Sequence, residues 1–174
     1  PCLPTATTPK RHTPYDSAPM DSVSTDHPLR ILHLEDSDAD HQLVALMLQR
    51  AELNCTLTQT DSLTTFGSLL EQEAFDLILA DYRLPGFTAL DAWDVASRAA
   101  QPPAFVLLSG AIGEKAAVDI MRLGFADYLL KDDLTRLPHV IQRALEVQEA
   151  KRTREKAVAE LARSEQRLAD LTEH

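Results

Sequence analysis

The chain has 174 residues with a formal net charge of −10, and 44% of its residues are hydrophobic but only 5% are aromatic. This composition is typical of one soluble α/β domain with appendages, and no apolar run approaches the roughly 20 residues that a membrane-spanning helix needs. Between residues 31 and 137, 17 acidic residues stand against 7 basic ones. That balance argues against nucleic-acid binding by this segment and is compatible with a cation site.

The N-terminal segment is rich in Pro, Thr, Ser and Asp without periodicity, so residues 1–28 are predicted to be a disordered extension. Pro1 cannot be a native initiator, whereas Met20 can; in that case residues 1–19 do not belong to the native protein. The segment lacks the apolar centre of a signal peptide, and the two cysteines suggest no disulfide framework. We therefore expect a cytoplasmic protein.

The first strand is expected at residues 29–34, and an acidic loop at 35–40 follows it. Asp36 and Asp38 in this loop are good N-caps for the next helix, which is expected to end near Ala51.

A second strand, 55–60, alternates in the manner of a half-exposed edge strand, and Ser62 caps the helix that follows. Residues 77–80 form a short apolar run, and the Pro-Gly pair a few residues later closes it. This pattern indicates a strand buried on both faces, as in parallel sheets. The run ends on Asp81, at the kind of strand end where ligands and chemistry collect.

A third helix, a buried fourth strand at 104–109, a fourth helix closed by Gly124 and a fifth strand at 126–131 complete the pattern. The alternation predicts an α/β fold with a doubly wound, flavodoxin-like five-stranded parallel sheet in the order 2-1-3-4-5. We assign residues 29–148 to this domain.

The last helix is expected to start near Leu134 and, with no Gly or Pro after Pro138, to run unbroken to Leu171. Residues 149–174 form a linker that has nothing left in this chain to cover. Apolar residues fall on heptad a and d positions, although two polar residues interrupt the seam, so a solvated helix and a two-stranded coiled coil both remain open. The apolar positions are Val147, Ala150, Ala157, Leu161, Leu168 and Leu171.

Polar side chains follow four of the five strands: Glu35 and Asp36 the first, Asp81 the third, Ser109 the fourth and Lys131 the fifth. Each has a plain structural explanation alone, but the predicted strand order brings them to one edge. Crowded carboxylates raise one another's pKa unless a cation joins them, and oxygen ligands suit Mg²⁺ or Mn²⁺. A metal and a lysine there would stabilise a phosphoryl group that an Asp carboxylate accepts as a mixed anhydride.

Four motifs occupy these strand ends: LEDS, LILADYRLPG, VLLSGAIGE and ADYLLK. With them, residues 30–148 resemble the receiver domain of two-component response regulators. Flavodoxin shares the predicted topology, but the acidic first loop would repel a phosphate in the absence of a metal.

The resemblance implies a role for each polar residue and a phosphohistidine donor on a histidine kinase or phosphotransfer protein. The domain would then be a signalling domain and not itself an enzyme. The implied roles are Asp81 as phosphoacceptor; Glu35, Asp36, Asp81 and the backbone carbonyl of Arg83 as Mg²⁺ ligands; Ser109 as the switch hydroxyl; Tyr128 as the aromatic that turns inward; and Lys131 as the partner of the phosphate.

One departure is that Asp132 follows Lys131 where the family usually has Pro, so we expect a trans bond and a differently shaped loop. The KDDL string resembles receivers fused to sensory modules, and the tail ARSEQRLADLTEH resembles a helix that leads into a PAS domain. A PAS-like module in the same polypeptide is therefore expected, with no direct contact to nucleic acid or membrane. A homodimer through the C-terminal helix stays one of the two open alternatives for the tail. The alternative is a dimerising scaffold with a non-functional phosphorylation site.

The histidines carry no recognisable motif. None of His33, His41 and His139 pairs with a Cys or another His at ligand spacing, so we expect no metal site among them.

Overall fold

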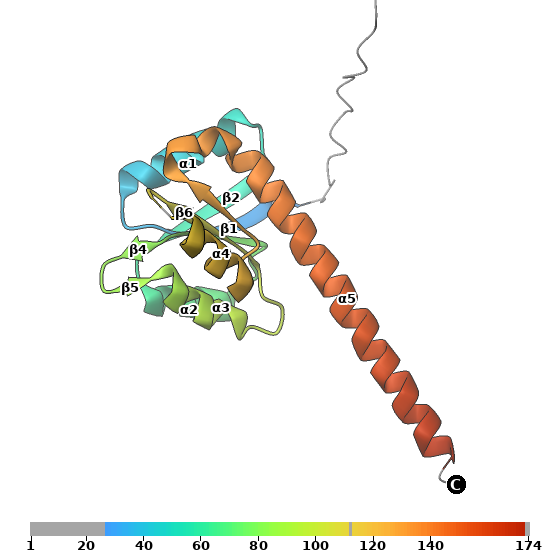
Figure 1. The fold of residues 1–174 in the computed structure, drawn as a ribbon. Helices are drawn as coiled ribbons and strands as arrows, with labels where there is room; N and C mark the ends of the chain where they lie inside the picture. Colours follow the sequence, from blue (N-terminus) through green and yellow to red (C-terminus); the bar gives the residue numbers. More distant parts are fainter. Residues whose placement is uncertain (1–26, 112, 173–174) are drawn as a thin grey trace, which may run out of the picture.

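The computed structural model describes residues 27–111 and 113–172 (Figure 1). The predicted N-terminal extension, 1–28, lies outside the described residues except for its last two. Five strands form one parallel sheet in the order β2-β1-β3-β6-β7, which confirms the predicted doubly wound topology. The strands are β1 (Leu29–Leu34), β2 (Cys55–Thr60), β3 (Leu77–Asp81), β6 (Ala104–Ser109) and β7 (Asp127–Leu130).

Helices cover both faces of the sheet (Figure 1). Alternate residues of the central strands point to opposite sides, so that Ile31 and Leu79 pack under α1 and α5 while Leu32 and Phe105 pack under α2, α3 and α4. Both faces are therefore dry, which explains the continuous apolar runs in the central strands. The helices are α1 (Asp38–Arg50), α2 (Leu63–Gln72), α3 (Ala89–Ser97), α4 (Glu114–Leu123) and α5 (Leu137–Thr172).

The acidic loop supplies the N-cap of α1, as predicted, but neither of the two carboxylates named as good caps is the one used. Ser37, not Asp36 or Asp38, caps the helix: its backbone is extended, and its hydroxyl oxygen accepts a hydrogen bond from the backbone N–H of Asp40 at 3.2 Å. Asp38 is already the first helical residue. The cap at Ser62 and the left-handed Gly124, with φ of 105° after α4, are as predicted.

A short hairpin after β3 was not predicted. It consists of β4 (Arg83–Leu84) and the antiparallel β5 (Phe87–Thr88), joined by a turn in which Gly86 has φ of 85°. Leu84 is buried, which anchors the hairpin beside β3.

The connection from β7 to α5 also differs from the predicted elements. The strand ends at Leu130, and a 3-10 helix, η1 (Lys131–Arg136), precedes α5, which begins at Leu137 with Pro138 in its first turn, where its missing N–H costs nothing. Asp133, inside η1, has non-helical dihedral angles and kinks this short helix. Every described peptide bond is trans, as expected for the bond before Asp132.

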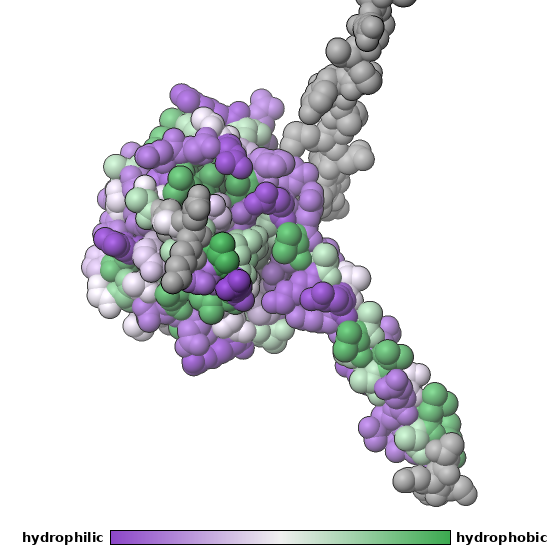
Figure 2. All heavy atoms as spheres, in the orientation of Figure 1, coloured by the Kyte–Doolittle hydropathy of each residue, from purple (hydrophilic) through white to green (hydrophobic). Residues whose placement is uncertain are grey.

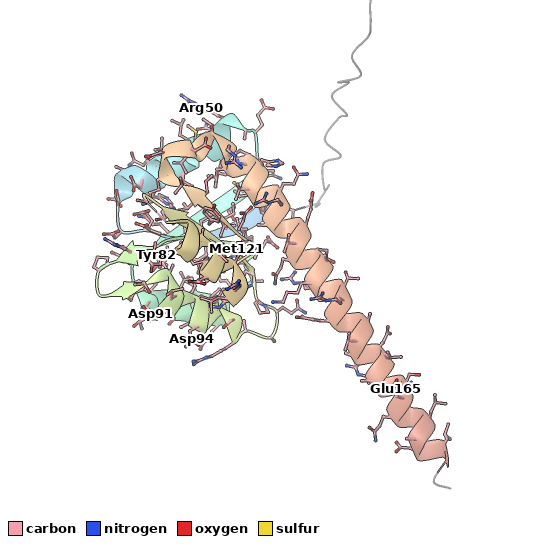
Figure 3. The ribbon with its side chains drawn as sticks, viewed as in Figure 1. Arg50, Tyr82, Asp91, Asp94, Met121 and Glu165 are labelled. Carbon is pink, nitrogen blue, oxygen red and sulfur yellow. The ribbon has the colours of Figure 1, made fainter. Side chains whose placement is uncertain are left out.

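The last helix runs without a break to Thr172, as predicted. Its first turns bury Val140, Ile141 and Ala144 against the sheet, and the side chains of Gln148 and Arg152 donate hydrogen bonds to the carbonyl of Pro102. Beyond Arg152 the described side chains are exposed, and the helix projects as a rod, with Glu165 on its far part (Figures 1 and 3). The described helices include none that is long and apolar enough to cross a membrane.

Candidate functional site

Three carboxylates meet at the carboxyl ends of neighbouring strands. Glu35 and Asp36 follow β1, and Asp81 is the last residue of β3, which pairs directly with β1. One carboxylate oxygen from each lies within 4.8 Å of the other two. Glu35 is buried, Asp81 is partly buried and Asp36 is exposed, so the group opens to solvent on the side of Asp36. The structure therefore brings together the acidic residues that the sequence placed at these strand ends.

Lys131 supplies the positive charge of the site. As the first residue of η1 it reaches back over the sheet edge, and its Nζ donates hydrogen bonds to Glu35 Oε2 at 2.8 Å, Asp40 Oδ2 at 2.7 Å and Asp81 Oδ2 at 3.0 Å. An ammonium has three N–H donors, so these contacts use all of them. The Lys131 side chain is only 19% exposed, which strengthens each contact relative to a surface ion pair.

Asp40 is the member of this cluster that the sequence reasoning missed. It is the last residue of the acidic loop that was singled out at 35–40, and the structure places it in the first turn of α1. The sequence did contain a sign of this position. Because α1 follows β1 after a short loop, its first turn must lie at the same edge of the sheet as the end of β1.

The electrostatic environment keeps Lys131 charged and raises the pKa of Glu35. Burial lowers the pKa of the Lys131 ammonium, but hydrogen bonds to Asp40, Glu35 and Asp81 outweigh it, so its pKa is raised well above the usual value. Burial raises the pKa of Glu35, and hydrogen bonds from Lys131 and the backbone N–H of Ser37 offset this only in part.

The remaining predicted residues differ in their burial. Ser109 is buried at the end of β6, and its hydroxyl donates a hydrogen bond to the carbonyl of Ala111 at 3.3 Å. Arg83 is exposed at the start of β4, two residues beyond Asp81. Tyr128 is not part of the cluster: it lies on the exposed side of β7, with 38% of its surface accessible.

His33 and His41, which show no ligand spacing in the sequence, lie side by side in the fold. The packing of α1 on β1 stacks the two rings, with a hydrogen bond between their Nδ1 atoms at 2.9 Å. His33 is fully buried, and among the described residues its Nε2 has no hydrogen-bond partner. The pair lies beside the acidic cluster but does not belong to it. Among the described residues, the only group of three or more that could hold a metal ion is Glu35, Asp36 and Asp81.

Acid is expected to destabilise the fold through His33. Its pKa falls from 6.5 to about 3, because the ring is buried and lies near His41 and Lys131. Above pH 6.5 the ring is neutral in both the folded and the unfolded chain, so it contributes nothing. As the pH falls from 6.5 towards 3, the unfolded chain binds a proton that the folded chain does not, and the free energy of unfolding decreases, by about 2 kcal/mol at pH ~5.

Urea unfolding of the wild type and of His33→Leu, repeated from pH ~7.5 to ~5, measures this contribution. The variant lacks the histidine, so its free energy of unfolding should fall less steeply than that of the wild type. Parallel pH profiles for the two proteins would contradict the prediction.

A doubly wound parallel sheet that gathers three acids and one lysine at its carboxyl edge defines the class of receiver-type signalling domains. The profile of the response regulator receiver domain matches residues 31–142, and the chain belongs to this family.

Individual relatives agree with the family assignment. Regulatory protein AtoC of Escherichia coli (strain K12) is 31% identical over 128 residues, which are 71% of this chain and 26% of AtoC, so the chain spans about a quarter of this curated relative. The signal receiver domain of an HD domain-containing protein from Pseudomonas fluorescens Pf-5 superposes with a TM-score of 0.62 at 22% identity, covering 71% of this chain and 99% of that one. The N-terminal domain of a response regulator/sensory box/GGDEF 3-domain protein from Carboxydothermus hydrogenoformans gives 0.60 at 20%, covering 70% and 98%. At these identities the solved structures show the shared fold.

Proposed function

We propose that the chain is the phosphoacceptor domain of a cytoplasmic two-component phosphorelay and that Asp81 receives the phosphoryl group. The donor is a phosphohistidine on a histidine kinase or phosphotransfer protein. The observation that supports this most directly is the convergence of Glu35, Asp36, Asp81 and Lys131 at one edge of the sheet. An isolated cluster of acids would repel a phosphoryl group, whereas this one contains a lysine that can pair with it.

In the proposed reaction an oxygen of Asp81 attacks the phosphorus of phosphohistidine. The new O–P bond forms as the P–N bond breaks, and its electron pair goes to the imidazole nitrogen of the donor. Lys131 already touches Asp81 and carries a stable positive charge, so it can pair with the negative phosphoryl oxygens without long movement.

The same residues fit a divalent cation. Receiver domains bind Mg²⁺ near an acidic cluster, and Glu35, Asp36 and Asp81 offer three carboxylate oxygens close together with one open side. We assign these residues and the backbone carbonyl of Arg83 as the Mg²⁺ ligands, with Mn²⁺ as a substitute. Bound there, the ion would offset the charge of the phosphoryl group during transfer.

Ser109 and Tyr128 are the proposed switch residues. Ser109 holds the carbonyl of Ala111 through one weak hydrogen bond, which a phosphoryl oxygen on Asp81 can replace. The hydroxyl then moves toward Asp81, and the exposed Tyr128 ring turns into the vacated space. The change biases the surface formed by α4, β7 and α5.

Trp93 reports this change. Its indole packs on Phe105 of β6, the strand that ends at Ser109, and on Phe125, just before β7. Beryllofluoride, a phosphoryl mimic, is expected to change Trp93 fluorescence in the presence of Mg²⁺ and to leave it unchanged when EDTA is present. An unchanged spectrum in saturating beryllofluoride and Mg²⁺ would support a dimerising scaffold with a non-functional site instead.

The domain organisation is proposed as a receiver at 29–148 followed by a helical linker at 149–174 that carries the signal to a PAS-like module in the same polypeptide. Support comes from the unbroken α5, which joins the receiver to the exposed rod, and from the Carboxydothermus neighbour, which is the N-terminal domain of a response regulator/sensory box/GGDEF 3-domain protein. Gln148 and Arg152 fasten α5 to Pro102 of the receiver. A rotation of the receiver would therefore be transmitted to the exposed part of the helix.

Self-association through α5 is the associated prediction. Apolar residues are interspersed with polar ones along the rod (Figure 2), and Leu161, at an a position, is 62% exposed. The wild type is expected to dimerise in sedimentation equilibrium, and Leu161→Glu should weaken dimerisation at least about tenfold because it buries charge in the seam. Gln166→Glu adds the same charge on the opposite side of the helix and serves as the control. Equal dissociation constants for the two variants would argue against this seam.

A further inference from the structure

Asp40 makes the shortest of the three contacts to Lys131, at 2.7 Å, yet it is the most exposed of the three carboxylates. Its side chain is 42% accessible, against 17% for Asp81 and 1% for Glu35. It is not one of the grouped metal-ligating residues, and the proposed phosphoryl transfer does not use it. Its contact with Lys131 therefore needs its own explanation.

The three donors of the ammonium are all taken, so a phosphoryl oxygen can bind Lys131 only if one carboxylate releases it. Glu35 is buried, and its release would leave a carboxylate in the core without its cation, which is strongly unfavourable. Asp81 carries the phosphoryl group itself. The half-exposed carboxylate of Asp40 can be solvated by water once it has lost Lys131, so its contact with Lys131 costs the least free energy to break.

We propose that Asp40 is a positioning residue that holds Lys131 in the pocket while Asp81 is free and competes with the phosphoryl group for its ammonium. The inference rests on the proposed function, because it assigns Lys131 to the phosphoryl group. Asp40 lies in the first turn of α1, and its release on phosphorylation frees a contact between α1 and the start of η1.

Removal of the competitor should make the phosphorylated state easier to reach. In Asp40→Asn, beryllofluoride is expected to bind at least about fivefold more tightly than in the wild type, at saturating Mg²⁺. Asp38→Asn is the matched control, since it removes the same charge from the same helical turn but from an exposed residue that makes no contact with Lys131. Its affinity should change less than about twofold. Asp40→Glu, which keeps the charge, should restore part of the competition.

A direct repulsion between Asp40 and the phosphoryl group would also tighten binding in Asp40→Asn. The two causes separate in a Lys131→Met background, where an effect that acts through the lysine disappears and a direct repulsion persists. Persistence of the full effect in Lys131→Met would overturn the proposal, and so would equal affinities of Asp40→Asn and Asp38→Asn.

A second readout needs neither Mg²⁺ nor phosphoryl mimic. The ¹⁵N resonance of the Lys131 ammonium should shift, and its protons should exchange faster with water, in Asp40→Asn but not in Asp38→Asn. If the wild type does not bind beryllofluoride, the proposed function fails whatever this spectrum shows. If it binds and the two variants behave alike in both measurements, only the role of Asp40 fails.

Discussion

The Asp81→Asn variant is expected to accept no phosphoryl group from acetyl phosphate and Mg²⁺ under conditions that fully modify the wild type. The amide oxygen can still accept a hydrogen bond from Lys131, so the pocket survives, but an amide is a poor nucleophile and cannot form the mixed anhydride. The rate of modification should fall by at least about a thousandfold. Intact-protein mass spectrometry over time measures the gain of one phosphoryl group.

Asp94→Asn is the matched control, because Asp94 is an exposed residue of α3 whose ion pair is with Arg98 and not with Lys131. It should be modified at the wild-type rate. Modification of Asp81→Asn at a comparable rate would mean that another residue is the acceptor, and the proposed role of Asp81 would be wrong. The Trp93 response to beryllofluoride should disappear in the same variant.

The central strands were readable from the sequence because helices cover them on both faces. Ala104–Ser109 is buried along its whole length, and such a strand appears as an uninterrupted apolar run that stops where the chain leaves the core. The stops at Asp81 and Ser109 therefore marked the edge of the sheet. Strand order followed from the alternation with helices, and the convergence of the polar ends followed from strand order.

Features that depend on how a helix is rotated against the sheet were not readable. The stacking of His33 on His41 and the contact of Asp40 with Lys131 both require that α1 turn a particular side toward β1. Residues eight apart on a strand and a helix have no fixed spacing in three dimensions, and 91 residues separate Asp40 from Lys131. The hairpin at Arg83–Leu84 was missed for another reason: strands of two residues carry no periodicity.

The cap of α1 shows the limits of propensity. Asp36, Ser37 and Asp38 are all good N-cap residues, and the sequence alone does not rank them. In the folded chain Glu35 accepts a hydrogen bond from the backbone N–H of Ser37 at 3.0 Å, which fixes the turn so that the Ser37 hydroxyl, not either carboxylate, faces the helix N–H groups. Asp36 is thereby left exposed beside the acidic cluster.

Substitution of Lys131 by Met is expected to lower the free energy of unfolding by about 3 kcal/mol at pH ~8 without divalent cations. The variant leaves Glu35, Asp40 and Asp81 around one pocket with no ammonium, and Glu35 is buried there. Lys156→Met, in the exposed part of α5, removes the same charge from the surface and should change the stability by less than about 0.5 kcal/mol.

The loss should depend on pH in a defined direction. Burial already raises the pKa of Glu35 above its unfolded value, and removal of Lys131 takes away the largest influence that opposes it. A carboxylate whose folded pKa is raised binds its proton more readily in the folded chain, so the stability of Lys131→Met should recover as the pH falls through the folded pKa of Glu35. The difference from the wild type should therefore be smaller at pH ~5 than at pH ~8. A difference that is constant or grows toward acid would contradict the assignment of the loss to unpaired carboxylates.

The stabilisation of the two proteins by Mg²⁺ tests the same cluster of carboxylates. In the wild type a divalent cation must share Glu35 and Asp81 with the ammonium, whereas in Lys131→Met it meets the carboxylates alone. Saturating Mg²⁺ should therefore raise the free energy of unfolding of Lys131→Met by more than that of the wild type, because a ligand that binds the folded state more tightly stabilises it more. Urea unfolding of both proteins across a Mg²⁺ titration measures the two increments. Equal increments would mean that Lys131 and the ion do not compete for the same oxygens, and the proposed ligand set would need to be revised.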